Sequence, residues 1–307
     1  MKKDQLTIVI PCYNEEESLK ENINKLVEFA QINSFNLIFV NDGSNDGTQK
    51  ILDNFKSNEN VKIIEHIINR GYGAALKSGI FAADTDYVIT MDADGQHNMN
   101  DIKIFYELIK NNRADLIVGK REKSKSDSAY RSIGKFLIRK LANYLVPSKI
   151  TDINSGFKIY RTSLAKKYIQ LCPDSMAFSD VITLIFVSQK HFVIEQNIKT
   201  NPRIKGSSTI STKTAFETVI EILNIVMFFN PLKIFITISV FFIACGILWG
   251  LPILLKGKGI SIGASLLINT GLIFSLLGLI SEQLSLIRKQ LIRDVQINSE
   301  NNKSENN

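Results

Sequence analysis

Cysteine and histidine are scarce in this sequence, and neither residue type is clustered. The three cysteines, Cys12, Cys172 and Cys245, stand far apart and include no Cys-x-x-Cys pair. The three histidines are scattered as well. This distribution argues against a disulfide scaffold, a structural zinc site and a histidine metal cluster, and it suits a reducing compartment.

Charge is missing from two long segments near the C-terminus, residues 234–255 and 260–280. Each reaches the length of about 20 apolar residues that a membrane-spanning helix needs. Only Lys256 to Gly259 separate them, which is too short for anything but a tight hairpin. A pair of buried core helices is the alternative, but adjacent uncharged runs of this length are rare in soluble domains. The sequence therefore predicts two transmembrane helices.

A secretory signal peptide is not expected, because the apolar run after Lys2 and Lys3 covers only residues 6–10. Over the whole chain, 37 Lys and Arg outnumber 30 Asp and Glu, which gives a formal net charge of +7. Such an excess favours an acidic partner: a phosphate, an anionic membrane surface or a nucleic acid. The basic residues lack interleaved stacking aromatics and a known nucleic-acid-binding module, so nucleic acid is not expected.

Apolar runs alternate with helical patterns through the first part of the chain. Helices are predicted between the runs by apolar residues at helical spacing, and the first opens at Asn14 with Glu17 as its capping-box partner. This alternation predicts an α/β fold with a mostly parallel sheet, helices on both faces and ligands at the carboxyl ends of the strands. The predicted strands are residues 6–10, 36–40, 61–64, 87–91, 116–119 and 191–198, and residues 151–161 are expected to form a loop that enters a short strand.

The strand predicted at residues 87–91 ends in the run Asp92-Ala-Asp-Gly-Gln96. Alternate residues of an extended segment point to the same side, so Asp92, Asp94 and Gln96 are expected to project together. Two carboxylates and an amide oxygen form a hard oxygen set that suits Mg²⁺ or Mn²⁺. Such an ion usually takes its other ligands from water and substrate phosphates. For a bare Asp-x-Asp the alternative is a solvated turn.

The composition changes after this region. Residues 113–149 hold ten Lys or Arg against three Asp or Glu, with an amphipathic helix predicted over residues 128–146. A second amphipathic helix, over residues 214–229, is expected to lie along the membrane surface before the first span. The last residues, 298–307, are polar and are expected to be disordered. The predicted domains are a catalytic domain (1–212), a juxtamembrane helix (213–231), a transmembrane hairpin (232–287) and a polar tail (288–307).

Four stretches taken together resemble the family 2 glycosyltransferases of the GT-A fold, and in particular the dolichyl- or polyprenyl-phosphate sugar synthases. The resemblance covers about residues 7–208 and implies a doubly wound GT-A sheet. It also implies that Asp92, Asp94 and Gln96 bind the metal that holds the diphosphate of a nucleotide sugar. The stretches are Pro11-Cys-Tyr-Asn-Glu-Glu16, Val40-Asn-Asp-Gly-Ser44, Arg70-Gly-Tyr-Gly73 and Asp92-Ala-Asp-Gly-Gln96.

The same resemblance implies a donor site. The loop at residues 11–16 would line the nucleoside pocket, and Asp42 would face the base or ribose. The Arg203-x-x-Gly-x-Ser208 loop would cover the diphosphate. Lys205 would replace a lysine that often follows this serine, where Thr209 stands here. Each feature has an alternative explanation. The loops at residues 11–16 and 41–48 could simply be turns, residues 70–73 could start a helix, and Lys77 could be an exposed helix lysine. The implied nucleotide-sugar-binding residues are Pro11, Tyr13, Asn14, Glu15, Asp42, Gly71, Lys77, Asp92, Lys205 and Ser208.

An acceptor site is implied in the basic segment and just after it. Arg121 and Arg131 resemble positions that face the acceptor phosphate, a task that suits the planar fork of arginine. Ser155 belongs to a further matching pattern, Asp-x-x-Ser-Gly-Phe-x-x-Tyr-Arg. Asp180 is either a base-like carboxylate or an exposed helix residue. The expected catalytic set is Asp94, Asp180 and Arg203.

The sequence thus predicts an integral membrane enzyme with its catalytic domain and C-terminus in the cytoplasm. It would transfer a hexose, glucose or mannose above all, from a UDP- or GDP-sugar to polyprenyl (undecaprenyl or dolichyl) phosphate, with inversion and with Mg²⁺ or Mn²⁺. A homo-oligomer is compatible with the sequence. The alternatives are a family 2 enzyme with a glycan or diacylglycerol acceptor, and a non-catalytic membrane protein that binds nucleotide sugars. The intact Asp-x-Asp-x-Gln run argues against the last.

Overall fold

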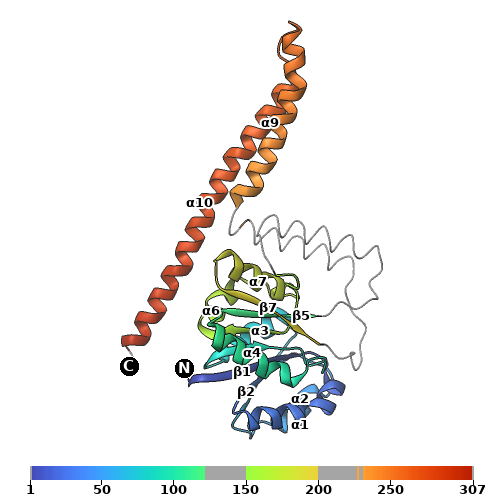
Figure 1. Ribbon diagram of the computed structural model, residues 1–307, viewed down its shortest axis with the longest axis vertical. Coiled ribbons are helices and arrows are strands. Elements are labelled where there is room, and N and C mark those ends of the chain that lie inside the picture. The colour runs from blue at the N-terminus through green and yellow to red at the C-terminus, as the bar shows by residue number, and fades with distance from the viewer. Residues whose placement is uncertain (1, 122–149, 200–226, 228–230, 306–307) are drawn as a thin grey trace. The chain divides into compact units, whose positions relative to one another are not determined.

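The computed structural model describes residues 2–121, 150–199, 227 and 231–305 (Figure 1). These residues form an α/β unit and a C-terminal helical unit, and each unit is described by itself. The amphipathic helices predicted over residues 128–146 and 214–229 lie outside the described residues, apart from residue 227, which is helical.

The α/β unit contains a seven-stranded sheet of order β3-β2-β1-β4-β6-β5-β7. Only β6 among the described strands runs antiparallel to its neighbours, β4 and β5, and the other pairings are parallel. The predicted α/β fold with a mostly parallel sheet is therefore confirmed. The strands are β1 (Lys2–Cys12), β2 (Asn36–Asp42), β3 (Val61–His66), β4 (Thr85–Thr90), β5 (Leu116–Arg121), β6 (Lys158–Arg161) and β7 (Val193–Ile198). The helices are α1 (Glu16–Ile32), α2 (Thr48–Asp53), α3 (Tyr72–Ala82), α4 (Met99–Asn112), α6 (Thr162–Tyr168), the short 3₁₀ helix η1 (Ile169–Leu171) and α7 (Phe178–Ser188).

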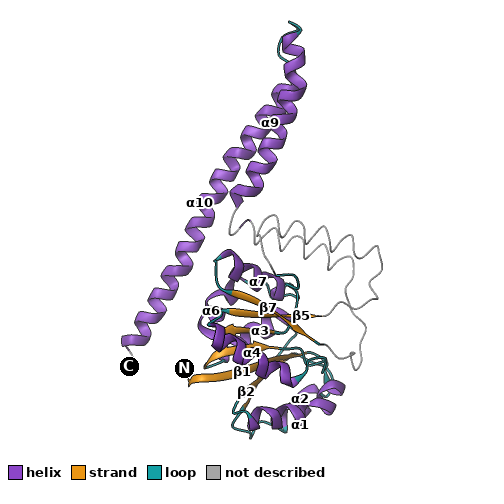
Figure 2. Cartoon of the chain, in the orientation of Figure 1, coloured by secondary structure: helices purple, strands orange, loops and turns teal. Residues whose placement is uncertain are grey.

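Helices cover both faces of the sheet, as the alternation of side chains in the strands requires (Figure 2). Ile8 and Ile10 of β1 point into the core that α1 and α4 share. Val9, between them, points the other way and lies next to Gly79 of α3. The carboxyl ends of β1, β2, β3, β4 and β5 consequently meet at one edge, together with the loop that enters β6.

Strand β1 is longer than predicted, because it continues through Pro11 to Cys12. Proline lacks a backbone N–H and usually interrupts the hydrogen bonding of a central strand. Here the pairing of β1 with β4 stops at Val9, while the pairing with β2 continues through Pro11. The missing N–H of Pro11 therefore falls at a point where no β4 partner is required.

The C-terminal unit is a helical hairpin of α9 (Pro231–Leu255) and α10 (Ile262–Glu305), which lie side by side in Figure 1. Gly257 and Gly259 turn the chain between them with φ values of 67° and 78°. Such left-handed backbone suits glycine. Glycines also allow close approach of the two helices: a Cβ at Gly246 would lie 2.7 Å from Ile268, and one at Gly271 would lie 2.6 Å from Ile243.

Most of the apolar surface of the hairpin is not covered by protein. In the most apolar 18-residue stretch of α9 only 11% is buried, and in that of α10 only 17% is buried. Buried helices of a soluble core would show the opposite, so both helices fit the predicted membrane spans. The predicted disorder is wrong for residues 298–305, because α10 runs on to Glu305. Glu300, Lys303 and Glu305 have good helix propensity, and a helix that is already nucleated propagates easily.

Candidate active site

The loops that follow β1 and β2 are fastened to each other. Asn14 donates its backbone N–H to Ser44 Oγ at 3.0 Å, and its side-chain Oδ1 accepts the N–H of Asn45 at 2.9 Å. Asn14 adopts a left-handed φ of 55° to do this. The predicted capping box of Asn14 and Glu17 is therefore wrong: α1 begins only at residue 16, and the polar side chain of Asn14 is used across the loops.

The second loop supplies the missing cap of α1. Thr48 Oγ1 accepts the N–H of Glu15 at 2.9 Å, and Asp46 accepts that of Glu16 at 3.1 Å. In return, the carboxylate of Glu16 accepts the N–H of Gly47 at 2.8 Å. These bonds satisfy helix N–H groups that have no intrahelical partner. They hold two loops, distant in sequence, as one rigid rim.

Four residues predicted to line a nucleoside pocket lie on this rim. Pro11 is the next-to-last residue of β1, and Tyr13, Asn14 and Glu15 follow the carboxyl end of this strand. The ring of Tyr13 is 45% exposed, whereas Asn14 and Glu15 take part in the bonds between the loops. Turn formation and a ligand-facing position are compatible here, and nucleoside binding by these residues stays a prediction.

Asp42, predicted to face the base or ribose, is buried and fully engaged with protein groups. Its carboxylate lies 2.6 Å from Nδ1 of His66 and accepts the N–H groups of Arg70 at 3.0 Å and Gly71 at 2.8 Å. Nε2 of His66 in turn lies 2.9 Å from Ser78 Oγ. Asp42 therefore fixes the loop between β3 and α3, a role that the sequence did not predict.

The N-terminus of α3 is covered by another part of the chain. The carbonyl of Asp174 accepts the N–H groups of Gly73 at 2.8 Å and Ala74 at 3.3 Å, and its carboxylate binds Lys77 at 2.6 Å. A Cβ at Gly71 would collide with the same carbonyl. Gly71 thus lies against a protein loop directly before α3, which fits the alternative of a helix start. Binding of a nucleotide sugar by Gly71 stays a prediction. Lys77 is paired with Asp174 in this structure.

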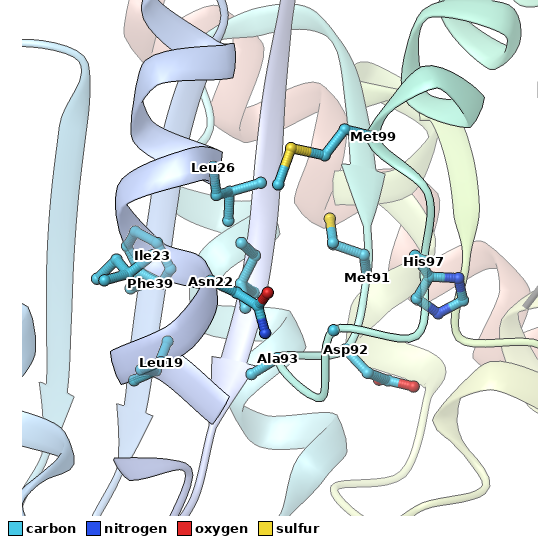
Figure 3. Close-up of a pocket in the computed structure, with 12 residues that line it drawn as sticks. Leu19, Asn22, Ile23, Leu26, Phe39, Met91, Asp92, Ala93, His97 and Met99 are labelled. Atoms are coloured by element: carbon cyan, nitrogen blue, oxygen red, sulfur yellow. The ribbon is translucent and has the colours of Figure 1, made fainter. Parts of the chain in front are cut away.

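The run that contains Asp92, Asp94 and Gln96 is a turn, not the extended segment predicted (Figure 3). β4 ends at Thr90, and Gly95 takes a left-handed φ of 71°. Asp94 Oδ1 accepts the N–H of Gln96 at 3.1 Å, which is the local bond that Asp forms in Asx turns. The expectation of alternate side chains on one side therefore does not apply, although the turn keeps the three residues within one short loop.

Asp92 is held by a neighbour that the sequence did not single out. The hydroxyl of Tyr72 donates to Asp92 Oδ1 at 2.9 Å. Burial and the adjacent Asp92 carboxylate raise the pKa of Tyr72, so it remains a protonated donor. A Cβ at Gly156 would lie 2.9 Å from the Tyr72 hydroxyl and 3.0 Å from the Asp92 carboxylate. Gly156 therefore leaves the space in which this pair meets.

His97, which follows the turn, stacks on Phe157 with ring centroids 4.8 Å apart. Burial lowers the pKa of His97, although the charges of Asp92 and Asp94 oppose this shift. A histidine with a lowered pKa is neutral at neutral pH. It therefore does not offset the negative charge of the two carboxylates.

A cavity of about 50 Å³ lies beneath the turn, between α1, β1, β2 and the start of α4. Substrate pockets in proteins hold roughly 300 Å³ or more. The cavity is therefore a packing gap under the Asp92 turn and not a place for a nucleotide sugar. Its lining, drawn in Figure 3, is largely apolar and includes Leu19, Ile23, Leu26, Phe39, Met91, Ala93 and Met99.

Arg121, predicted to bind an acceptor phosphate, forms a two-pronged ion pair with Asp152. Its Nε and Nη2 atoms donate to the two carboxylate oxygens at 2.9 and 3.0 Å. Glu195 accepts the backbone N–H of Asp152 at 2.8 Å, which fixes the carboxylate further. Ser155, the other described acceptor candidate, is fully buried, and its Oγ accepts the N–H of Phe157 at 3.3 Å.

Asp180 is buried in the first turn of α7, with 6% of its surface exposed. The alternative of an exposed helix residue is therefore wrong. Its charge acts on Arg121 and on Lys158, a buried lysine at the start of β6. Sequence reasoning missed Lys158 because a lysine in a short strand is normally exposed. Arg131, Arg203, Lys205 and Ser208 lie outside the described residues.

The donor atoms of the Asp92 turn suit a divalent cation. Within the described ranges, no three Cys, His, Asp or Glu side chains are placed to form a metal site by themselves. A Mg²⁺ or Mn²⁺ ion needs no such cage, because it is commonly bound through one or two carboxylates and substrate phosphates. Two carboxylates and one amide in a single turn, beside a neutral histidine, fit that requirement.

Comparison with known proteins assigns the chain. The model of "Glycosyl transferase family 2" matches residues 7–169, just over half of the 307 residues. The chain belongs to glycosyl transferase family 2. A second model, "GtrB C-terminal hairpin", matches residues 230–287 and so covers both apolar helices. The predicted family is therefore confirmed, and the hairpin indicates a membrane protein.

Relatives of this family 2 glycosyltransferase include lipid-phosphate enzymes. It is 28% identical to the undecaprenyl-phosphate 4-deoxy-4-formamido-L-arabinose transferase of Proteus mirabilis, over 68% of this chain and 64% of the relative. It is also 28% identical to the dolichol-phosphate mannosyltransferase of Pyrococcus furiosus, over 69% of this chain and 61% of the relative. The chain thus spans slightly less than two thirds of the length of both.

A solved structure supports the fold of the α/β unit. Glucosyl-3-phosphoglycerate synthase from Mycobacterium tuberculosis, in complex with Mn²⁺, uridine diphosphate and phosphoglyceric acid, superposes with a TM-score of 0.58. The match covers 72% of this chain and 78% of the other at 14% sequence identity. At this identity the similarity shows a shared GT-A fold, which confirms the predicted fold class.

Proposed function

We propose that this family 2 glycosyltransferase moves a hexose, glucose or mannose, from a UDP- or GDP-sugar to polyprenyl phosphate at a membrane. One observation carries the proposal: a polar carboxyl edge with the Asp92 turn and a two-helix apolar hairpin occur on one chain. The edge supplies a place for a nucleotide sugar, and the hairpin keeps the enzyme where a lipid acceptor resides. The relatives with undecaprenyl- and dolichol-phosphate in their names support the same acceptor class.

The donor would bind along the rim formed by the loops after β1 and β2, with its diphosphate toward the Asp92 turn. Asp92, Asp94 and Gln96 would hold Mg²⁺ or Mn²⁺, which would offset charge on the diphosphate. Tyr72 keeps Asp92 in one orientation through its 2.9 Å hydrogen bond. A preorganised carboxylate of this kind loses little energy to rearrangement during the reaction.

The acceptor phosphate needs no strong base. Its second pKa is about 6, so it is already largely ionised at neutral pH. One phosphate oxygen would attack the anomeric carbon, a new carbon–oxygen bond would form, and the bond to the nucleoside diphosphate would break with its electrons. In-line displacement inverts the anomeric configuration. The chain's contribution is to position the two anions, with Arg121 and Arg131 on the acceptor and Arg203 on the diphosphate.

The acceptor can be identified directly with the full chain in lipid nanodiscs. UDP- and GDP-hexoses should each be offered with undecaprenyl phosphate, dolichyl phosphate, diacylglycerol or an oligosaccharide, and products identified by mass spectrometry. We expect one donor to add a single hexose to a polyprenyl phosphate. Undecaprenol without phosphate is the matched control and should remain unmodified. A glycosylated diacylglycerol or oligosaccharide, with polyprenyl phosphate unchanged, would refute the acceptor class.

We further propose that the catalytic unit and the C-terminus both lie on the cytoplasmic side. Nucleotide sugars are made in the cytosol, and two spans return the chain to the side from which it entered. Arg288, Lys289 and Arg293 after the second span favour a cytoplasmic tail, although Lys256 and Lys258 in the turn oppose this charge rule. The location of the donor decides between them.

Labelling with an impermeant thiol reagent in intact cells tests this orientation. A cysteine at Gly257 should react, and one at Ser304 should react only after lysis. Cys12 and Cys172 provide little background, because both are buried and burial raises the pKa of each thiol. Cys245, within α9, should be replaced by alanine beforehand. Reaction at Ser304 but not at Gly257 in intact cells would reverse the orientation.

A further inference from the structure

Lys158, the first residue of β6, is a completely buried lysine. It exposes 0% of its surface, and its neighbours in register are Thr90 of β4 and Val118 of β5. Burying an ammonium group is costly unless it is well hydrogen-bonded. A lysine at this place therefore indicates a specific set of partners, which the structure provides.

The partners of Lys158 are two backbone carbonyls from separate segments. Nζ donates to the carbonyl of Ile153 at 2.9 Å and to that of Ser179 at 2.6 Å. Ile153 directly follows Asp152, the residue that binds Arg121. Ser179 directly precedes Asp180. The single ammonium group therefore joins the peptide units next to two acidic residues of the candidate active site.

The acidic residues also surround Lys158 electrostatically. Burial lowers the pKa of Lys158 to about 7, while the charges of Asp180 and Asp152 raise it and that of Arg121 lowers it further. Cys172 is the remaining titratable group that acts on it. Lys158 thus lies among the charges of Asp152, Asp180 and Arg121 and not merely beneath the sheet edge.

A chain of contacts extends from Lys158 to the Asp92 turn. The side chain of Ser179, whose carbonyl Lys158 holds, acts on the hydroxyl of Tyr72 and lowers its pKa, against the larger effects of burial and Asp92. The hydroxyl of Tyr72 donates to Asp92 at 2.9 Å. A displacement of the first turn of α7 would therefore also shift Tyr72 and the Asp92 carboxylate, which is proposed to face the diphosphate.

We propose that Lys158 is a positioning residue for the transfer reaction: it fixes the Asp152 loop and the start of α7 relative to each other. The inference rests on the proposed function for its chemistry, but its structural part can be tested without any substrate. The Arg121–Asp152 ion pair and Asp180 keep their relative positions only while Lys158 binds the carbonyls of Ile153 and Ser179. Misplacement by about 1 Å can cost an enzyme 10²-fold in rate.

The test compares Lys158→Met and Lys158→Arg in the full chain in nanodiscs. Methionine is unbranched and one atom shorter than lysine, and it cannot donate a hydrogen bond. We therefore expect kcat to fall at least tenfold while the Kd for the nucleoside diphosphate with Mg²⁺ stays within about threefold. Arginine can still donate to carbonyls and should restore part of kcat. Lys62→Met, on the exposed side of β3, is the matched control and should behave as wild type.

Hydrogen exchange of the substrate-free proteins supplies the second readout. In Lys158→Met, peptides covering residues 151–157 and 178–183 should exchange faster than in wild type, and peptides from α1 and α4 should not. Unchanged exchange in those peptides, or unchanged kcat despite faster exchange, would overturn the proposal. If Lys158→Met does not fold, Thr183→Val decides, because Thr183 Oγ1 donates to the same two carbonyls at 3.4 and 2.9 Å. Thr183→Val should then show a smaller increase in exchange of the same peptides and a smaller loss of kcat. If neither changes, the proposal is refuted.

These outcomes are separable from failure of the proposed function. If the wild-type enzyme modifies a different acceptor, the acceptor class is wrong, and kcat of the Lys158 variants is measured with that acceptor instead. If transfer to polyprenyl phosphate is confirmed but Lys158→Met is as active as wild type, only the inference about Lys158 fails.

Discussion

Replacing Asp94 by alanine is expected to abolish sugar transfer while the protein stays folded and membrane-bound. Asp94 exposes only 5% of its surface and belongs to the turn that carries the proposed oxygen ligands after the carboxyl end of β4. A bound divalent cation stabilises developing charge by several kcal/mol, and each 1.4 kcal/mol corresponds to a factor of about ten. We therefore expect kcat/KM to fall on the order of 10³-fold.

Chelation should have the same effect on the wild-type enzyme. Excess EDTA should stop transfer, and Mg²⁺ or Mn²⁺ should restore it in the wild type but not in Asp94→Ala. Asp84→Ala is a suitable control, because Asp84 precedes the other end of the same strand and its side chain is 86% exposed. Full activity in excess chelator would remove the cation from the mechanism, and a fully active Asp94→Ala would remove this carboxylate.

The parallel strands could be predicted from sequence because each is a short apolar run ending in polar turn residues. β4 and β5 illustrate this, since both were predicted with nearly correct limits. A short strand was expected within residues 151–161, but the position and direction of β6 in the sheet could not be predicted. Its four residues, Lys158–Arg161, carry no apolar pattern of their own, and their place between β4 and β5 depends on tertiary pairing.

The described candidate residues near β1 and β4 lie at the strand ends where the sequence predicted them, but the backbone conformation predicted around Asp92 was wrong. Around Asp92, strand alternation was assumed, whereas the bond between Asp94 and the Gln96 N–H closes a turn. Asp42 looked like a ligand-binding carboxylate, but it is occupied by His66 and two backbone N–H groups. The bonds of Asp42 join residues more than 20 positions apart, so no local pattern in the sequence reports them.

Buried charge was the other feature beyond the reach of the sequence. Asp180 and Lys158 are charged residues in segments whose sequence pattern does not show which side chains are buried. Only the packing of α7 against the sheet shows that both are inside. A buried pair of this kind is informative because charged residues are seldom buried without partners. That is why the structure, and not the sequence, draws attention to this side of the site.

The Arg121 ion pair leads to the second large expected effect: Arg121→Ala should lower kcat/KM for the acceptor lipid on the order of 10²-fold. Burial by itself would raise the pKa of Asp152, but the hydrogen bonds and charge of Arg121 bring it below its usual value. Only two side-chain nitrogens of Arg121 bind Asp152, and the side chain is 45% exposed. Guanidinium has five N–H donors, so the remaining ones can reach a phosphate. A hydrogen bond to a charged group contributes about 1.5–3 kcal/mol.

Asp152→Asn separates the two roles of Arg121. If the arginine acts only by holding Asp152, the asparagine variant should reproduce the loss in acceptor use. If it binds the acceptor phosphate, Arg121→Ala should raise the acceptor KM far more than Asp152→Asn does, and Arg121→Lys should fall between, because lysine keeps the charge without the planar fork. Binding of the nucleotide sugar, measured separately, should be nearly unchanged in all three. Loss of nucleotide-sugar binding with normal acceptor use would mean that Arg121 binds the donor. Arg131→Ala is expected to act in the same direction as Arg121→Ala, so the acceptor role of Arg131 would then have to be revised as well.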